Sequence, residues 1–316
     1  MMGYIKIGRC RWNFCRVNRN PLPPRARSTA DSVYWHNIVQ RLADSSHYLD
    51  AFLGQLKRQA YLALIQRWEG MPTTGRVLKT DLFEEAMGPD AFLTDLSHGG
   101  ALVIGLDIST ATANHAQRRD PDRQAHYVAA DIRHLPFAND AFALIVSPST
   151  LDHFPDPCDL GRSLRELARV LAPGGRLIIT LDNRQNIFVP LFRLVIRMGW
   201  APYSVGRSYS VSELCEALET AGLTVQETTA IFPNPRLMAV GAVAMANKLR
   251  WPTLTAFIQR ALVAVQRLEK TPWRYRTGSF VAAKAIRRGS GFESDIQSDG
   301  RQVPDAPWPL MFPRQG

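Results

Sequence analysis

Two hydrophobic patterns alternate along this chain from residue 76 onward. Short runs rich in valine, isoleucine and leucine indicate strands that are buried on both faces of a sheet. These predicted strands cover residues 76–80, 101–109, 125–131, 140–147, 176–182, 223–231 and 279–288. Longer stretches, in which apolar residues return every three or four positions, indicate amphipathic helices. These predicted helices cover residues 46–68, 89–98, 110–119, 158–172 and 210–222, with one or two more in 236–269, broken at Trp251 and Pro252.

The order of these elements predicts the fold class. Strands that alternate with helices are joined by right-handed crossovers, and such connections build a parallel sheet. The helix at 158–172 shows the pattern well, because Leu160, Leu164, Leu167 and Leu171 share one face and glycines follow at once. We therefore expect a doubly wound α/β fold.

The two ends of the chain differ from this central region. Residues 1–44 lack sustained periodicity and include the sequence NPLPPRARS, so we expect a mostly disordered leader. Residues 289–316 are rich in Gly, Ser, Pro and Asp, and we expect a disordered tail there. One domain is then expected between them, at 45–288.

Charge and cysteine content narrow the possible binding partners and cellular compartments. The net charge is +10, and residues 1–30 contribute +7 of it without a single acid. Such an arm can bind nucleic acid or anionic lipid, or it can be only a leader. No apolar run reaches the length of a membrane-spanning helix. The four cysteines have no metal-ligand spacing and are typical of free thiols in a reducing cytoplasm, so we expect a cytoplasmic protein without a metal.

Polar residues follow the predicted strands at their carboxyl ends. Ligands of open α/β sheets bind at this edge, so these residues are candidates for a site. In chain order they are Asp81, Glu84 and Glu85; Asp107; Asp131; Ser147, Ser149, Asp152 and His153; and Asp182 and Asn183.

Two of these acids favour a nucleoside ligand. A carboxylate at Asp107 can accept hydrogen bonds from both hydroxyls of a ribose, and one at Asp131 can accept the exocyclic amine of adenine. The alternatives are a helix cap for Asp107, a role that Ser109 or Thr110 can also fill, and a solvated loop position for Asp131.

The sequence resembles a known family at this point. The segments VIGLDIS, VAADIRHLPFANDAFALIVSPSTLDHF and LRELARVLAPGGRLIITLDN resemble, in this order, the class I S-adenosylmethionine-dependent methyltransferases, and especially their ubiquinone and menaquinone biosynthesis branch. The resemblance is strong over residues 75–183 and extends through 209–225 to the last strand at 279–288. It implies a mostly parallel seven-stranded Rossmann-like sheet with an N-terminal helix and helical lid insertions at 187–206 and 232–275.

The resemblance also implies roles for individual residues. S-adenosylmethionine is the implied cofactor, held through its ribose by Asp107 and through its adenine amine by Asp131. The residues that would lie against the adenine or beneath the methyl group are Ile108, Ile132, Ser147, Pro148 and Ser149.

The first turn departs from the family pattern. The family places an acid and then alternate glycines directly after the first strand, but this chain reads RVLKTDLFEEAMG, in which the first glycine is Gly88. We expect Asp81, with Glu84 or Glu85, to bind the amino group of the cofactor, and Lys79 or Thr80 to help with its carboxylate. The alternative is a decayed site in a non-catalytic binding protein.

Methyl transfer mainly requires that the nucleophile, the methyl group and the sulfur lie in line and that water is excluded. His153 is the candidate for a general base, or else a structural hydrogen bonder. The apolar segment 187–206 favours a hydrophobic or aromatic small acceptor beneath a lid, although core packing, a dimer face or weak contact with a membrane surface are alternatives. We do not expect a nucleic-acid substrate, because SPSTLDHF stands where the Asn/Asp-Pro-Pro-aromatic signature is required. A nicotinamide-dependent dehydrogenase would need the missing glycine fingerprint.

Overall fold

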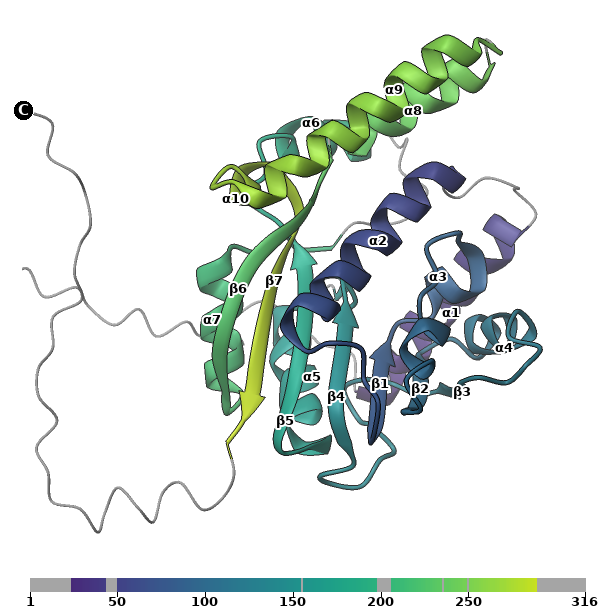
Figure 1. Ribbon diagram of the computed structural model, residues 1–316. Helices are drawn as coiled ribbons and strands as arrows, with labels where there is room; N and C mark the ends of the chain where they lie inside the picture. The colour runs from purple at the N-terminus through teal and green to yellow at the C-terminus, as the bar shows by residue number, and fades with distance from the viewer. Residues whose placement is uncertain are drawn as a thin grey trace, which may run out of the picture.

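A computed structural model describes residues 24–43, 50–154, 156–197, 206–234, 236–248 and 250–288. One seven-stranded sheet, in the order β3-β2-β1-β4-β5-β7-β6, forms the centre of the protein (Figure 1). Only β7 runs antiparallel to its neighbours. The strands are β1 (Arg76–Thr80), β2 (Leu102–Asp107), β3 (His126–Ala129), β4 (Phe142–Pro148), β5 (Leu171–Asp182), β6 (Leu223–Pro233) and β7 (Gly278–Arg287). The predicted fold class and all seven predicted strands are therefore confirmed.

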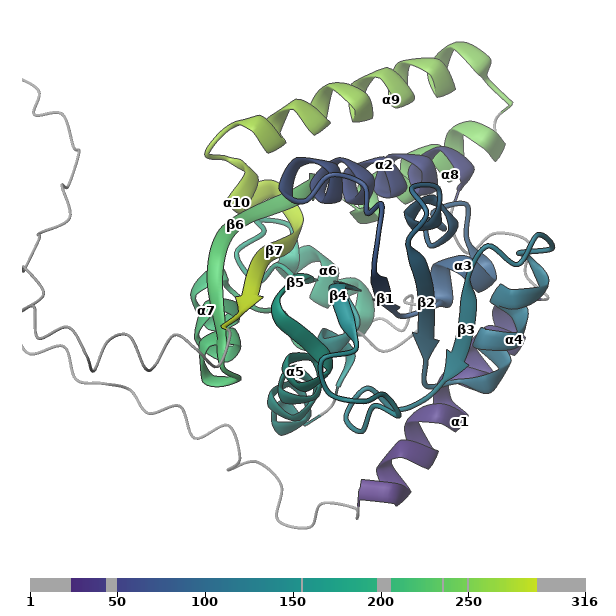
Figure 2. The same cartoon turned by 60° about the horizontal axis from the view of Figure 1, so that its bottom comes forward.

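Helices cover both faces of the sheet because successive strand residues point to opposite sides. Val77 and Ile178 belong to one hydrophobic cluster, whereas their neighbours Leu78 and Ile179 belong to the other. Figure 2 shows α2, α8 and α9 on one side of the sheet and α5 on the other. The longer helices are α2 (Ala51–Trp68), α4 (Thr110–Arg118), α5 (Pro157–Val170), α6 (Val189–Arg197), α7 (Val211–Thr220), α8 (Arg236–Lys248) and α9 (Pro252–Val265).

The predicted helix at 46–68 begins later than expected. Asp50 is its N-cap and accepts a hydrogen bond from the Phe52 amide, so α2 starts at Ala51. The break expected at Trp251 and Pro252 is confirmed, since Pro252 opens α9. Of the expected lid 187–206, α6 lies within the described residues and 198–205 lies outside them.

The leader contains one ordered helix, where the sequence indicated a mostly disordered segment. Residues Pro24–Ala43 form α1, which packs against α3 (Phe83–Met87) and α4. The helix shows little periodicity because few of its side chains, such as Ile38 and Val39, are fully buried. That expectation was wrong for these residues; residues 1–23 and the expected tail lie outside the described part of the chain.

The prediction of a helix at 89–98 was also wrong. Only a short 3-10 turn, η1 (Thr94–Ser97), forms there, and α3 precedes it. The amides of Phe92 and Leu93 donate to a carboxylate oxygen of Glu85, at 3.2 and 3.1 Å. A buried side chain thus sets the backbone of this segment.

A glycine of β2 makes room for the glycine-poor first turn. A Cβ atom added to Gly105 would lie 2.4 Å from Cδ2 of Leu82 and 2.8 Å from Cδ2 of Leu93. Leu82 is fully buried and occupies this space. The large side chain of Leu82 therefore fits in the turn because the facing position of β2 has no side chain.

We predict that Gly105→Ala destabilises the fold by about 1 to 3 kcal/mol, the usual effect of overpacking a core. Chemical denaturation measures the change. The matched control is Gly241→Ala on α8, where an added Cβ meets no atom within 4 Å. Combining Gly105→Ala with Leu82→Ala should cost less than the sum of the two single substitutions, and strict additivity would contradict the packing argument.

Candidate functional site

A pocket lies at the carboxyl edge of the sheet, above β1, β2 and β4. Its volume is about 350 Å³. The residues that line it are Ala30, Asp31, Tyr34, Trp35, Lys57, Asp81, Phe83, Glu84, Leu106, Asp107, Ile108, Thr112, Ala130, Asp131, Ile132, Ser149, Thr150, His153, Phe154, Asp182 and Phe280. Carboxylates and apolar side chains therefore form most of the wall.

The first turn keeps the shape that glycine usually supplies. Asp81 has a φ of 70°, in the left-handed region that aspartate tolerates better than most residues. Its Oδ1 accepts a hydrogen bond of 2.8 Å from the Phe83 amide, which closes the turn. Aspartate thus provides both the unusual backbone conformation and a carboxylate at the pocket wall.

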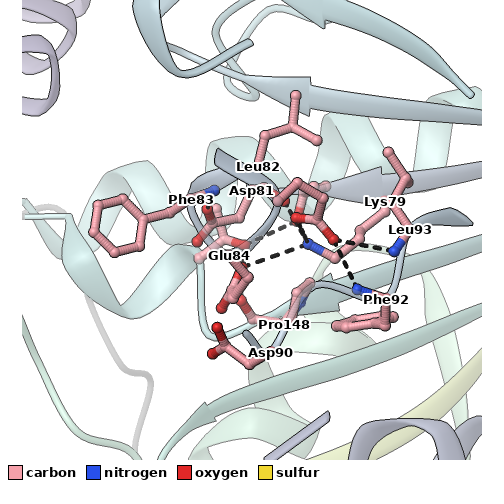
Figure 3. Close-up of polar contacts among 12 residues, drawn as sticks. Lys79, Asp81, Leu82, Phe83, Glu84, Asp90, Phe92, Leu93 and Pro148 are labelled. Carbon is pink, nitrogen blue, oxygen red and sulfur yellow. Dashed lines mark hydrogen bonds and ion pairs between the residues drawn. The ribbon is translucent and has the colours of Figure 1, made fainter. Parts of the chain in front are cut away.

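Beneath this turn, Lys79 is fully buried among acids (Figure 3). Its Nζ donates to Glu85 at 2.8 Å and to the carbonyl oxygen of Asp81 at 2.6 Å, and it lies 3.5 Å from Glu84. Burial lowers the pKa of the ammonium group, but the three acids around it outweigh burial and raise the pKa above its usual value. Lys79 therefore remains charged and fixes the turn from below.

A second lysine reaches the same acids from α2. Lys57 Nζ donates to Glu84 at 2.9 Å and to Asp90 at 2.8 Å. Burial raises the pKa of Glu84, but Lys57 and Lys79 together overcome this effect and lower it to about 2. Glu84 is therefore ionised at the pocket wall, next to an ammonium group.

Asp107 joins the end of β2 to the first turn. Its Oδ2 accepts from the Leu82 amide at 3.1 Å, and its Oδ1 accepts from the Ser109 amide at 2.8 Å. Burial raises its pKa to about 6, although both amide hydrogen bonds oppose this shift. Ser109, not Asp107, caps α4, so the carboxylate keeps lone pairs for a ligand.

Asp131 lies in the wall but already has a strong partner. Arg133 binds both of its oxygens, at 2.8 to 3.0 Å, and also pairs with Asp159 and with Asp31 of α1. Burial raises the pKa of Asp131, but the hydrogen bonds from Arg133 prevail and lower it. Little acceptor capacity is left on Asp131 for an adenine amine.

Aromatic rings of α1 and the first turn close the pocket from above. The ring of Trp35 lies 6.2 Å from that of Phe83 and 5.3 Å from that of His153, both in edge-to-face geometry. His153, on the short helix η2 (Leu151–His153), therefore faces the pocket beneath an indole. Phe83 forms part of the wall and does not fill the cavity.

The structure brings most of the predicted site residues to one pocket. The lining includes Asp81, Glu84, Asp107, Ile108, Asp131, Ile132, Ser149 and His153. Lys79, Thr80, Glu85 and Ser147 lie beneath it instead. Thr80 Oγ1 donates to Ser147 Oγ at 2.9 Å, and both side chains are buried. The interpretation of Lys79 as a ligand for the cofactor carboxylate does not fit this position.

Several lining residues were missed by the sequence analysis. Those of α1 fell within the expected leader. Lys57 lies on the apolar face of α2, near Leu56 and Ala60. A lysine on an apolar helix face is unusual, and this position could have indicated a functional residue. Phe280 belongs to the antiparallel strand β7, which no strand-end argument selects.

Known proteins match this chain in both sequence and fold. Residues 84–179 match the profile of a family described as a methyltransferase domain. A demethylmenaquinone methyltransferase from Chlamydia trachomatis is 33% identical over 180 residues, which are 56% of this chain and 63% of that protein. A possible histamine N-methyltransferase structure from Thermotoga maritima gives a TM-score of 0.51 at 16% identity, covering 81% of this chain and all of that one. The structure of the cyclase SpnF gives a TM-score of 0.54 at 16% identity, covering 83% and 96%.

These matches define a methyltransferase-type Rossmann-like fold. Residues 84–179 therefore carry a methyltransferase domain, and the chain is similar to the class I S-adenosylmethionine-dependent methyltransferases, as the sequence motifs predicted, although it spans less than two thirds of the length of the relative from Chlamydia trachomatis. S-adenosylmethionine is the cofactor that this similarity implies. The pocket fits such a ligand, because it combines carboxylates for a cationic tail and a ribose with the apolar side chains of Leu106, Ile108 and Ile132 for a base.

We predict that Lys79→Met destabilises the fold by about 3 to 5 kcal/mol, because the change leaves Glu85 as a buried acid without its partner. Urea denaturation at pH 7 measures the loss. The control is Lys270→Met at an exposed position, which should change the stability by less than about 0.5 kcal/mol. An equally small effect at Lys79 would show that this lysine does not organise the turn.

Proposed function

We propose that this protein transfers the methyl group of S-adenosylmethionine to a small hydrophobic or aromatic acceptor. The observation that carries the proposal is the charge state of the pocket. Within the described residues, neither Asp81 nor Asp107 forms an ion pair, although both line the cavity and are buried or nearly so. Uncompensated buried carboxylates favour a cationic ligand, and the sulfonium and ammonium groups of this cofactor supply that charge.

The chain's own residues can hold each part of the cofactor. Asp107 accepts hydrogen bonds from the ribose hydroxyls, since each of its oxygens has a lone pair beyond the amide that it already binds. Asp81 and Glu84 accept the ammonium group. When bound, the cofactor supplies a methyl group made electrophilic by its positive sulfur.

Lys57 is better placed than Lys79 for the carboxylate of the cofactor. It lines the pocket, and its ammonium group lies 2.9 Å from Glu84. A cation and an anion side by side match a zwitterion, whose ammonium and carboxylate groups are also adjacent. Among the lining residues, Lys57 is the one lysine or arginine.

Aromatic side chains favour an apolar acceptor and exclude water. Trp35, Phe83, Phe154 and Phe280 line the pocket from four different elements. Dry surroundings strengthen the electrostatic contacts and protect the reaction from hydrolysis. Where an acceptor must lose a proton, His153 is the lining residue suited to take it at neutral pH. The relative from Chlamydia trachomatis is named for a quinone acceptor, demethylmenaquinone, which agrees with an apolar acceptor for this protein.

A non-catalytic binding protein is the second candidate. The glycine-poor turn motivates it, and the match to a cyclase shows that this fold alone does not fix the reaction. The open cavity and the ordered, charged turn support a working site. A nucleic-acid substrate has no comparable support, because the lining carries an excess of acids.

We predict that S-adenosylmethionine binding weakens as the pH falls through about 6. Asp107, with a pKa raised to about 6 by burial, must be ionised to hold the ligand best. The association constant should therefore fall by about tenfold or more from pH 7 to pH 5, a consequence of protonating one such carboxylate. Isothermal titration calorimetry over this range measures it.

Asp107→Asn should weaken binding at pH 7 and flatten the pH dependence, whereas the exposed control Asp122→Asn should change neither. Transfer of labelled methyl groups from S-adenosylmethionine to low-mass compounds in a cell extract then separates the two candidates. Binding without any transfer, or absence of binding at every pH, would favour the non-catalytic protein, and absence of binding would overturn the proposed methyl transfer.

We predict that Lys57→Met weakens S-adenosylmethionine binding about 10- to 100-fold, the range for losing one hydrogen bond to a charged group. The same substitution should leave the affinity for 5′-methylthioadenosine unchanged, because this compound lacks the amino-acid tail. Calorimetry with both ligands measures the two effects. An equal loss for both ligands would mean that Lys57 supports the fold and not the carboxylate.

A further inference from the structure

The last two long helices expose several large apolar side chains. They belong to a segment that we name the C-terminal hairpin, residues 236–277, which comprises α8, α9, η3 (Gln266–Lys270) and α10 (Arg274–Thr277). Its exposed apolar residues are Met245, Trp251, Phe257, Val263 and Trp273, with exposed fractions between 49% and 69%. Single exposed apolar residues are ordinary, but such a group on one segment marks an interaction surface.

The exposed face of α9 mixes apolar and basic side chains. Phe257, Arg260, Val263 and Ala264 are all exposed and share one side of α9, because they follow one another at three-residue spacing or as direct neighbours. Arg267, in the η3 turn that continues α9, is also exposed. Leu262, on the other side, is buried. Figure 2 shows α9 along the outer edge of the molecule, beyond α2 and α8.

The charge of the hairpin is almost entirely positive. Its exposed basic residues are Lys248, Arg250, Arg260, Arg267, Lys270 and Arg276. Glu269 is the single acid between residues 236 and 277, and it lies 3.5 Å from Arg67 of α2 in an ion pair. The surface therefore complements a partner that is both anionic and apolar.

We propose that the C-terminal hairpin docks on the surface of an anionic lipid bilayer. Apolar side chains enter the acyl boundary, indole rings settle at the headgroup level, and lysine and arginine contact phosphates. The contact lies on the surface, because no helix in the described part of the chain is long and apolar enough to cross a membrane.

Other occupants fit this surface less well. A two-fold contact with a second copy would bring two basic faces together, and Glu269, the one acid of the hairpin, is already paired with Arg67. Nucleic acid would use the basic residues but would leave Phe257 and Val263 in water. An anionic bilayer satisfies both kinds of side chain.

The hairpin also lies close to the pocket edge. The Ile187 amide donates a hydrogen bond of 2.9 Å to the carbonyl oxygen of Arg276, and Ile187 is itself 53% exposed. Phe280, four residues after Arg276, lines the pocket. A lipid-soluble molecule at the docked surface would therefore lie near the site, although the docking itself does not depend on methyl transfer.

Co-sedimentation of the full chain with vesicles tests the proposal. We expect binding to vesicles of phosphatidylcholine with about one third phosphatidylglycerol, and weak binding to phosphatidylcholine alone or at high salt. Phe257→Ser with Val263→Ser, and separately Arg260→Glu with Arg267→Glu, should each reduce binding at least about fivefold, because each pair removes one of the two contributions to interfacial affinity.

Matched controls separate the hairpin from the basic residues of the leader. Leu102→Ser removes an exposed apolar side chain from the opposite edge of the sheet, and Arg76→Glu with Arg118→Glu makes the same charge change away from the hairpin. The controls should bind vesicles like the unmodified protein. The thermal shift produced by S-adenosylmethionine checks the fold of every variant, so that a failed docking test leaves the proposed function separately testable.

Three outcomes would overturn the proposal. Hairpin variants that bind as well as the controls would assign lipid binding to another segment. A dimer in lipid-free solution that Phe257→Ser abolishes would make the face a contact between copies. Binding of duplex DNA or RNA that requires Arg260 and Arg267, without vesicle binding, would make it a nucleic-acid surface.

Discussion

The ammonium group of Lys79 is the interaction on which the site depends. It lies at the end of β1 with no exposed surface, and it binds Glu85, the carbonyl oxygen of Asp81 and, at longer range, Glu84. One buried cation thereby gathers the acids of α3 and holds the first turn against the sheet. The family that the sequence resembles is expected to carry glycines in this turn. In this protein the ion pairs of Lys79 with Glu84 and Glu85 shape the turn. Glu84 also lines the pocket and contributes to the charge of its wall.

The acids of the pocket consequently fall into two groups. Glu84 and Asp131 already have basic partners in Lys57, Lys79 and Arg133, so their charges are balanced within the protein. Asp81 and Asp107 have none among the described residues, and burial raises the pKa of both. The first group builds the scaffold and sets the approach of helix α1 through Asp31. The raised pKa favours the neutral form of the second group, and a bound cation would stabilise its ionised form.

Periodicity and strand ends predicted the sheet and placed Asp81, Asp107 and Asp131 at one edge, because parallel strands present their carboxyl ends together. The same logic could not tell that Lys79 points beneath the turn, since either face of a doubly covered strand is buried. The periodicity argument also missed α1, because that helix buries few side chains and so shows no clear apolar stripe. Its contribution to the pocket comes from individual side chains such as Trp35. The pattern also predicted a helix at 89–98 and could not show that the side chain of Glu85, four residues before this segment, binds the amides of Phe92 and Leu93.

The contact between Leu82 and Gly105 joins a loop to a strand across 23 positions of sequence. Neither residue can change freely, since a side chain at Gly105 collides with Leu82, and a smaller residue at position 82 opens a void above the strand. Substitutions at the two positions are therefore coupled: a change to a glycine-bearing turn alters the space that any residue at position 105 can occupy.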